Sequence, residues 1–285
     1  MSCQLLALTL QLSTFHFQLS TLSFTPMPTK TSAPGTRPEG VQTEADASRK
    51  VREMFTQIAP RYDLLNHLLS LQLDRLWRKR VARQLRPILQ RSDATVLDLC
   101  CGTGDLAFSL AREGKAQIYG ADFAHSMLVR AKEKGAQLYE NSADPAPRTL
   151  PFLEADALRL PFADDSFDLV TTAFGFRNLA NYEAGLREIQ RVLKPGGTIA
   201  ILEFTEPPDN ILGNLYRWYF RSVLPRIGAA ISGDSAAYTY LPKSVSRFFL
   251  PPELAFLMQQ VGYISVNFRL WTFATVALHT AQRPR

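Results

Sequence analysis

A glycine-rich turn near residue 102 has the residue types that let a backbone approach a polar ligand. Residues 95–100 form an apolar run interrupted by Asp98, and Gly102 and Gly104 follow before a helical segment. A strand that leads through such a turn into a helix presents backbone N–H groups and the positive end of the helix dipole to a ligand. Asp122 lies twenty residues beyond Gly102, where an acid can bind ribose hydroxyls. The pattern predicts a site for a ribose-bearing cofactor, and alone it is compatible with a nicotinamide dinucleotide.

Three further features favour a different cofactor. Asp98 stands four residues before the first glycine, where a carboxylate can accept hydrogen bonds from an ammonium group or from loop amides. Asp156 and Ala157 follow the third expected strand, where an adenine edge could be recognised, and glycines in the turn at 194–197 permit positive φ. The set is similar to class I S-adenosylmethionine-dependent methyltransferases. That resemblance implies a cofactor site formed by Asp98, Gly102, Thr103, Gly104, Asp122, Asp156 and Ala157.

The elements that position these residues alternate between strand and helix patterns. Short apolar runs with helical segments between them predict a parallel sheet that is covered on both faces. The expected strands are 95–100, 117–121, 151–154, 167–174 and 198–204. Segments 263–270 and 273–281 add an antiparallel hairpin. We expect an α/β, Rossmann-like fold with a seven-stranded sheet.

Three segments lie outside this alternation. Residues 1–46 are expected to be a disordered leader, because the first 38 contain no Asp or Glu and are rich in Ser and Thr. Translated upstream DNA before a true start at Met27 is the favoured origin, and an organellar transit peptide is the alternative. The methyltransferase domain is then 47–285, with basic helices over 49–91 and a helical lid insertion over 207–250.

Longer stretches narrow the resemblance to one family. They include a Gly-Phe-Arg-Asn sequence and an Arg-Tyr-Asp sequence, and they span most of the chain from Val51 to Arg283. The stretches at 54–66, 102–105, 167–179 and 191–204 resemble the ubiquinone/menaquinone biosynthesis C-methyltransferases. Two departures are visible: Gln72 stands where a glycine is expected, and Ala173 stands where some members carry a serine.

The resemblance implies methyl transfer from S-adenosylmethionine to a ring carbon of a polyprenylated hydroquinone, with a demethylated naphthoquinol favoured over a benzoquinol. The ring must be reduced, since an oxidised quinone is electron-poor. Arg177 and Asn178 follow the fourth strand, at the sheet edge where such folds bind ligands. Arg177 is a poor base, so we expect it to stabilise the phenolate or polarise a water. Asn178 and Tyr62 are expected to orient the same oxygen.

The prenyl tail needs an apolar exit, and the insertion is rich in aromatic residues. The candidates are Tyr216, Trp218, Tyr219, Phe220, Val223, Leu224, Phe248, Phe249 and Leu250.

The amino-acid composition and the charge distribution indicate which partners the protein binds and where in the cell it acts. Residues 49–91 hold eleven basic and three acidic residues, against a net charge of +6 for all 285. This excess favours an anionic membrane surface as a peripheral partner, and hence a cytoplasmic enzyme at the inner membrane face or, with a transit peptide, an organellar one. Three cysteines form neither a disulfide framework nor a zinc motif. A homodimer or a quinone-biosynthesis complex is compatible with the sequence.

Other functional classes stay open at this point. A nicotinamide oxidoreductase would share the first strand, turn and helix. A nucleic-acid methyltransferase could use the basic helices, but the Asn/Asp-Pro-Pro-aromatic signature is absent, so we expect no nucleic-acid partner. A non-catalytic cofactor-binding subunit is disfavoured by Arg177 and Asn178.

Overall fold

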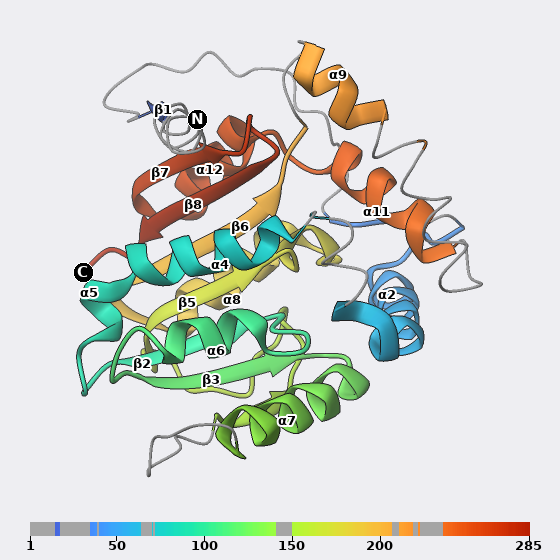
Figure 1. Ribbon diagram of the computed structural model, residues 1–285. Coiled ribbons are helices and arrows are strands. Elements are labelled where there is room, and N and C mark those ends of the chain that lie inside the picture. Colours follow the sequence, from blue (N-terminus) through green and yellow to red (C-terminus); the bar gives the residue numbers. More distant parts are fainter. Residues whose placement is uncertain are drawn as a thin grey trace, which may run out of the picture.

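The computed structural model describes residues 15–17, 35–38, 40–63, 70, 72–140, 150–206, 211–218, 222 and 236–285 (Figure 1). One mixed sheet organises them, in the strand order β1-β7-β8-β6-β5-β2-β3-β4. The strands are β1 (Phe15–Phe17), β2 (Thr95–Leu99), β3 (Gln117–Asp122), β4 (Phe152–Glu154), β5 (Phe167–Ala173), β6 (Leu193–Phe204), β7 (Ile264–Trp271) and β8 (Val276–Gln282). Strands β2 to β6 pair in parallel, and β8 runs antiparallel to both β6 and β7. The predicted seven-stranded sheet is confirmed by β2 to β8, and β1 adds a short edge strand.

Helices cover both faces of the sheet. They are α2 (Glu44–Ile58), α4 (Leu73–Gln84), α5 (Arg86–Leu89), α6 (Asp105–Ala111), α7 (His125–Glu140), α8 (Tyr182–Val192), α9 (Ile211–Trp218), α11 (Ala236–Arg247) and α12 (Pro251–Val261), with 3₁₀ turns η1 (Ala59–Arg61) and η2 (Phe176–Asn178). In Figure 1, α4 and α6 lie in front of the sheet and α8 lies behind it. Val96, Leu97 and Leu99 of β2 are almost fully buried because both faces are covered.

Two hydrophobic cores hold these layers together. The front core packs Trp77 and Val81 of α4 against Leu110 of α6 and the sheet. The rear core packs Ile189 of α8 against Met258 of α12. Both cores are continuous with the inner strands, so the carboxyl ends of those strands have little freedom to move relative to one another.

The domain begins earlier than the sequence predicted. The Thr36 N–H donates to the carbonyl of Leu179 at 2.7 Å, and the Arg37 guanidinium donates to the carbonyl of Ala180 at 2.7 Å. Helix α2 starts at Glu44, and the Thr43 hydroxyl caps it by accepting from the Asp46 N–H. The predicted boundary at residue 46 is therefore wrong, because polar contacts rather than apolar ones hold residues 35–46 to the domain. Of the residues before 35, only 15–17 are described.

Gln72 occupies a backbone conformation that favours glycine. Its φ is +63°, immediately before α4, and such a left-handed conformation is strained for most side chains. This explains why a glycine was expected at the position.

The predicted insertion at 207–250 contains α9 and α11. Among its aromatic candidates for the prenyl tail, Phe248 and Phe249 pack against Tyr182, so these two belong to the core instead. Trp218 is 57% exposed. Tyr219, Phe220, Val223, Leu224 and the Tyr216 side chain lie outside the described residues.

Candidate functional site

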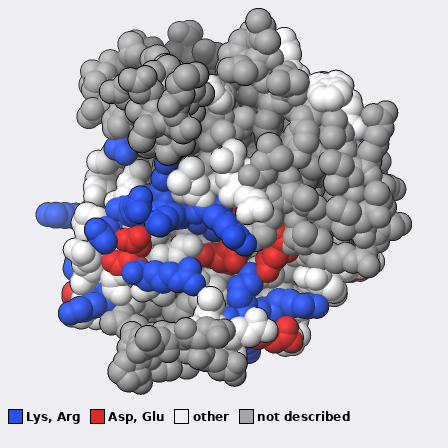
Figure 2. All heavy atoms as spheres, viewed as in Figure 1, with Lys and Arg blue, Asp and Glu red and all other residues white. Residues whose placement is uncertain are grey.

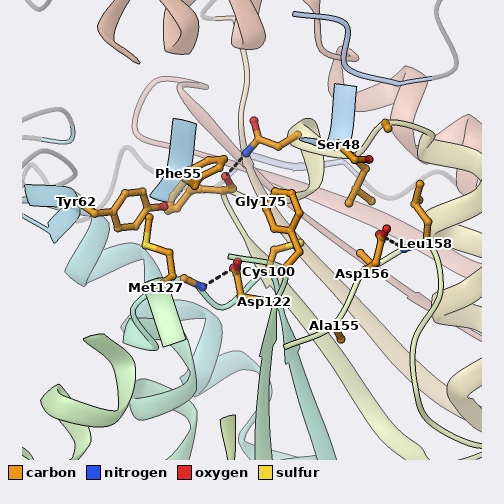
Figure 3. Close-up of a pocket in the computed structure, with 17 residues that line it drawn as sticks. Ser48, Phe55, Tyr62, Cys100, Asp122, Met127, Ala155, Asp156, Leu158 and Gly175 are labelled. Carbon is orange, nitrogen blue, oxygen red and sulfur yellow. Dashed lines mark hydrogen bonds between the residues drawn. The ribbon is translucent and has the colours of Figure 1, made fainter. Parts of the chain in front are cut away.

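A cavity lies at the carboxyl ends of β2, β3 and β5, the edge at which open α/β sheets bind ligands (Figure 3). Helix α2 and the turn after it close one side, and the loops after β4 and β5 close the other. The lining residues are Ser48, Phe55, Tyr62, Cys100, Gly102, Asp122, Phe123, Met127, Ala155, Asp156, Ala157, Leu158, Phe174, Gly175, Asn178, Leu179 and Ala180. Most are apolar, and the few polar groups converge from opposite walls, as in small-molecule sites.

Asp122 ties the glycine turn to the end of β3. One carboxylate oxygen accepts the Gly102 N–H at 2.9 Å and the other accepts the Ala124 N–H at 2.9 Å. Burial raises the pKa of Asp122 to about 6, although these backbone donors oppose the shift. Each oxygen keeps a further lone pair, so the carboxylate can also accept hydrogen bonds from ligand hydroxyls.

Asp98 lines a second, smaller cavity that shares Tyr62, Cys100 and Phe174 with the first. Its Oδ1 accepts from the Thr171 hydroxyl at 2.8 Å, and its buried Oδ2 has no hydrogen-bond partner in the described part of the chain. Burial raises the pKa of Asp98 to about 7. An unpartnered buried carboxylate oxygen beside a cavity fits a cationic group of a ligand.

The ends of β2 and β5 touch beneath the cavity. Cys100 and Phe174 follow these strands with φ of +54° and +60°, and both line the two cavities. A Cβ atom on Gly175 would lie 2.3 Å from the Cys100 Cβ, so only glycine fits there. Left-handed backbone at non-glycine residues is a feature of functional sites held by a rigid surrounding structure.

An ion-pair cluster lies at the outer side of the second cavity. The Thr103 hydroxyl donates to Asp63 at 2.5 Å, and Lys134 of α7 contacts Thr103, Asp63 and Asp105 at 3.0, 2.6 and 2.7 Å. Buried Arg78 of α4 joins Asp105 at 3.0 Å. The cluster therefore connects the glycine turn with α4, α7 and the turn after Tyr62.

Tyr62 and Asn178 reach the cavity from segments more than a hundred residues apart in the chain. The Tyr62 ring lies 3.5 Å from the position of a Cβ on Gly102, and it packs edge-on against Phe55 of α2. Asn178, in η2, is 8% exposed; its Nδ2 donates to the Phe174 carbonyl at 3.4 Å and its Oδ1 accepts from the Tyr240 hydroxyl at 3.0 Å. Figure 3 shows Tyr62 and Asp156 approaching the cavity from opposite sides.

Arg177 does not line the cavity. Its guanidinium forms a buried ion pair with Glu203 at 3.0 Å, donates to the Phe174 carbonyl, and donates from Nε to the Ser244 hydroxyl at 3.3 Å. It also lies over the Phe204 ring. This geometry holds η2 against β6 and α11, and it does not place the guanidinium beside a substrate oxygen as the sequence analysis predicted.

Most of the predicted site residues therefore come together. Gly102, Asp122, Asp156, Ala157, Tyr62 and Asn178 line the main cavity, and Asp98 and Thr103 line the adjoining one. Gly104 lies outside both, because it packs against Phe108 and Phe152. Sequence reasoning missed the apolar lining by Phe123 and Met127, the Asp63–Lys134 contact and Tyr240. Two of these residues had a signal in the sequence: Phe123 follows Asp122 directly, and Asp63 belongs to the Arg-Tyr-Asp sequence.

The chain is similar to known methyltransferases. Residues 42–283 match the sequence profile of the ubiE/COQ5 methyltransferase family. The chain is 48% identical over 232 residues to the demethylmenaquinone methyltransferase of Thermus thermophilus, which covers 81% of this chain and 100% of the relative. It is 41% identical to the ubiquinone/menaquinone biosynthesis C-methyltransferase UbiE of Syntrophotalea carbinolica, over 81% of this chain and 93% of that relative.

The fold resembles that of a solved methyltransferase. A structure from Thermotoga maritima, described as an S-adenosylmethionine-dependent methyltransferase and possible histamine N-methyltransferase, superposes with a TM-score of 0.57 at 18% identity. The match covers 81% of this chain and 99% of that one. This likeness supports the class I methyltransferase fold.

Proposed function

Because the chain belongs to the ubiE/COQ5 methyltransferase family, we propose that it transfers a methyl group from S-adenosylmethionine to a ring carbon of a polyprenylated quinol. One observation carries the proposal beyond family membership. The cavity brings the carboxylates of Asp122 and Asp156 together with Tyr62 and Asn178, so a cofactor and an oxygen-bearing ring can meet inside it.

The described residues fit S-adenosylmethionine. The unpartnered Oδ2 of Asp98 suits its ammonium group, and Asp122 suits its ribose hydroxyls. Asp156, whose Oδ1 accepts the Leu158 N–H at 2.9 Å, and Ala157 line the wall on which an adenine would lie. When bound, S-adenosylmethionine supplies an electrophilic methyl group, so the substrate must provide a nucleophilic carbon.

Tyr62 and Asn178 have the groups to make a quinol ring nucleophilic. A phenol has a pKa near 10, so it is mostly protonated at neutral pH. Hydrogen bonds to its oxygen must therefore stabilise the deprotonated form. An amide N–H and a tyrosine hydroxyl can stabilise the developing phenolate, which directs negative charge to the adjacent ring carbon. The described lining contains no histidine or lysine to act as a base. The carboxylates of the lining, Asp122 and Asp156, are assigned here to the cofactor, so we propose that these hydrogen bonds promote release of the proton to water.

We propose demethylmenaquinol as the ring substrate, in agreement with the name of the Thermus thermophilus relative. The name of the Syntrophotalea carbinolica relative leaves a ubiquinone-pathway benzoquinol as the alternative. Incubation with labelled S-adenosylmethionine and each reduced ring, with and without reductant, distinguishes the two. We expect label in the naphthoquinol only when it is reduced. Methylation of the oxidised ring, or of neither ring, would contradict the proposal.

We also propose that the protein takes its prenylated substrate at an anionic membrane surface, to which α4 binds peripherally. Arg75, Lys79 and Arg83 are exposed along one face of α4, and its single acid, Asp74, is buried. Figure 2 shows Lys and Arg gathered over this side of the molecule. Basic residues near an anionic leaflet contribute about 1 kcal/mol each. No helix in the described ranges has the length and apolar character that crossing a bilayer requires.

Apolar side chains accompany this basic face. Leu76 of α4 is 43% exposed, and Phe273, in the turn between β7 and β8, is 66% exposed. The Trp77 indole donates to Thr272 at 2.8 Å, which ties that turn to α4. Co-sedimentation with vesicles should therefore show binding to anionic but not neutral lipid, and the double variant Lys79→Glu/Arg83→Glu should lose it. The matched control is Arg187→Glu on α8, whose charge lies on the other side of the sheet; an equal loss there would contradict the surface.

A further inference from the structure

Three segments far apart in the chain meet at the side chain of Asn178. The Tyr240 hydroxyl of α11 lies 3.0 Å from Asn178 Oδ1 and 3.2 Å from the Thr36 hydroxyl. Thr36 is in turn fixed by its N–H, which donates to the Leu179 carbonyl. The N-terminal segment and α11 therefore converge on a residue that lines the cavity.

The hydrogen-bond roles along this chain are determined by what each group can do. The amide oxygen of Asn178 can only accept, so the single Tyr240 proton is donated to it. Burial raises the pKa of Tyr240, so the hydroxyl keeps that proton. The Thr36 hydroxyl must then donate to the Tyr240 oxygen. One N–H of Asn178 is directed to the Phe174 carbonyl, and its other N–H has no partner in the described ranges.

We propose that Tyr240 is a positioning residue that fixes the orientation of the Asn178 amide, so that an N–H and not the carbonyl oxygen faces the quinol oxygen. This inference rests on the proposed function. The two amide orientations fill almost the same space, so packing cannot choose between them. A flipped amide would place its oxygen against a developing phenolate and repel it. Two contacts disfavour this flip: the Phe174 carbonyl, which accepts an N–H of Asn178, and the hydrogen bond from Tyr240 to the amide oxygen.

Tyr240 then determines how the Asn178 amide is oriented, and Asn178 itself contacts the quinol oxygen. Tyr240 acts only through Asn178, so its loss should matter only while Asn178 is present. Thr36 acts one step further away and should have a smaller effect. Neither residue contacts the carboxylates that suit the cofactor, so affinity for S-adenosylhomocysteine should not change.

The test is a double-mutant cycle on turnover of the reduced ring substrate in vesicles. We expect Tyr240→Phe to lower kcat about tenfold and Asn178→Ala about a hundredfold, while the double variant matches Asn178→Ala. Thr36→Val should lower kcat two- to threefold, and Thr36→Ser should restore it. Equal tenfold losses from Tyr240→Phe in both backgrounds would overturn the proposal.

Tyr263→Phe provides the matched control. Its buried hydroxyl donates to the Leu186 carbonyl at 2.9 Å, away from the cavity. It should lower the thermal midpoint as Tyr240→Phe does, and leave kcat unchanged. A tenfold loss of kcat in this control would show that any lost tyrosine hydroxyl impairs turnover, and would overturn the positioning role.

A spectroscopic readout needs no substrate. The side-chain NH₂ signals of Asn178, assigned by their absence in Asn178→Ala, should shift and broaden in Tyr240→Phe with S-adenosylhomocysteine bound. Unchanged signals would overturn the positioning role even if turnover falls. Failure of the wild-type protein to methylate either ring would instead reject the proposed function and leave this measurement valid.

Discussion

The two sides of the cavity are built differently. The cofactor side is formed by residues close together in the sequence, such as Gly102, Asp122 and Asp156, each at the end of a neighbouring strand. The substrate side is assembled from Thr36, Tyr62, Asn178 and Tyr240, and the Thr36–Tyr240 contact spans 204 positions. The cofactor side keeps its geometry through the turns that follow neighbouring strands. The substrate side is held by long-range contacts, so its geometry depends on the stability of the whole domain. The predictions below test this difference.

The largest effect is expected at the buried ion pair behind the substrate side. Arg177→Ala should lower the free energy of unfolding by about 3–5 kcal/mol, because it leaves the Glu203 carboxylate buried without its partner. Urea denaturation measures this loss. Arg177→Met combined with Glu203→Leu should recover much of the stability. A fully stable Arg177→Ala variant with no turnover would instead restore a direct catalytic role for Arg177.

Acid should remove the stability that the buried, neutral His279 of β8 contributes. Burial lowers the pKa of His279 to about 4, from an ordinary value near 6.5. At this site the unfolded state therefore binds a proton at a higher pH than the folded state, so the contribution of His279 to stability is complete above pH 6.5 and falls as the pH drops toward 4. The raised pKa values of Asp98 and Asp122 act in the opposite direction over the same pH range. The expected loss is about 3 kcal/mol. The stability difference between the wild type and His279→Gln, measured by thermal unfolding at pH 7.5 and at pH 4, isolates this contribution and should show the loss.

On the cofactor side, Asp122→Ala should weaken S-adenosylhomocysteine binding by about 1–3 kcal/mol, because backbone and ribose donors lose their acceptor. Turnover at saturating cofactor should change much less than affinity. Calorimetry and steady-state kinetics separate the two quantities. Unchanged affinity would remove Asp122 from the cofactor site.

The smallest effect is expected at the N-terminus, where two truncations can be compared. A chain that begins at Ala47 loses the Thr43 cap of α2 and the contacts of Thr36 and Arg37, so its unfolding free energy should fall by about 1–2 kcal/mol. A chain that begins at Thr31 keeps all three and loses only the three-residue edge strand β1, so its unfolding free energy should fall by less than that of the shorter chain. Equal stability and turnover in both would restore the boundary near residue 46 that the sequence predicted.

The sequence predicted the sheet well because its signals are local. The apolar runs of β2 and β5 reflect burial on both faces, and the glycine turn follows directly from the first run. Asp98 and Asp122 could be assigned from their distance to the glycines. The sequence also indicated the left-handed backbone at Gln72, because a glycine is expected at this position.

The remaining features depend on contacts that no local pattern encodes. The orientation of Arg177 follows from Glu203 on β6 and Ser244 on α11, so a cavity-facing role and a buried ion pair look the same in the sequence. Tyr240 and Thr36 lie in segments without a motif. The boundary at residue 46 was misplaced because backbone and guanidinium hydrogen bonds, unlike apolar periodicity, leave no compositional signal.

The position of β8 has a consequence for how the protein is made. Residues 276–282 are synthesised well after β6, yet β8 pairs with β6 on one side and β7 on the other. Until they emerge, β6 has one open edge and β7 lacks its main partner, and open strand edges invite pairing with other chains. The growing chain can therefore form its inner parallel strands during translation, but it can close the sheet only after β8 has left the ribosome. A chain that ends before β8 would be aggregation-prone, although every residue proposed for catalysis would be present.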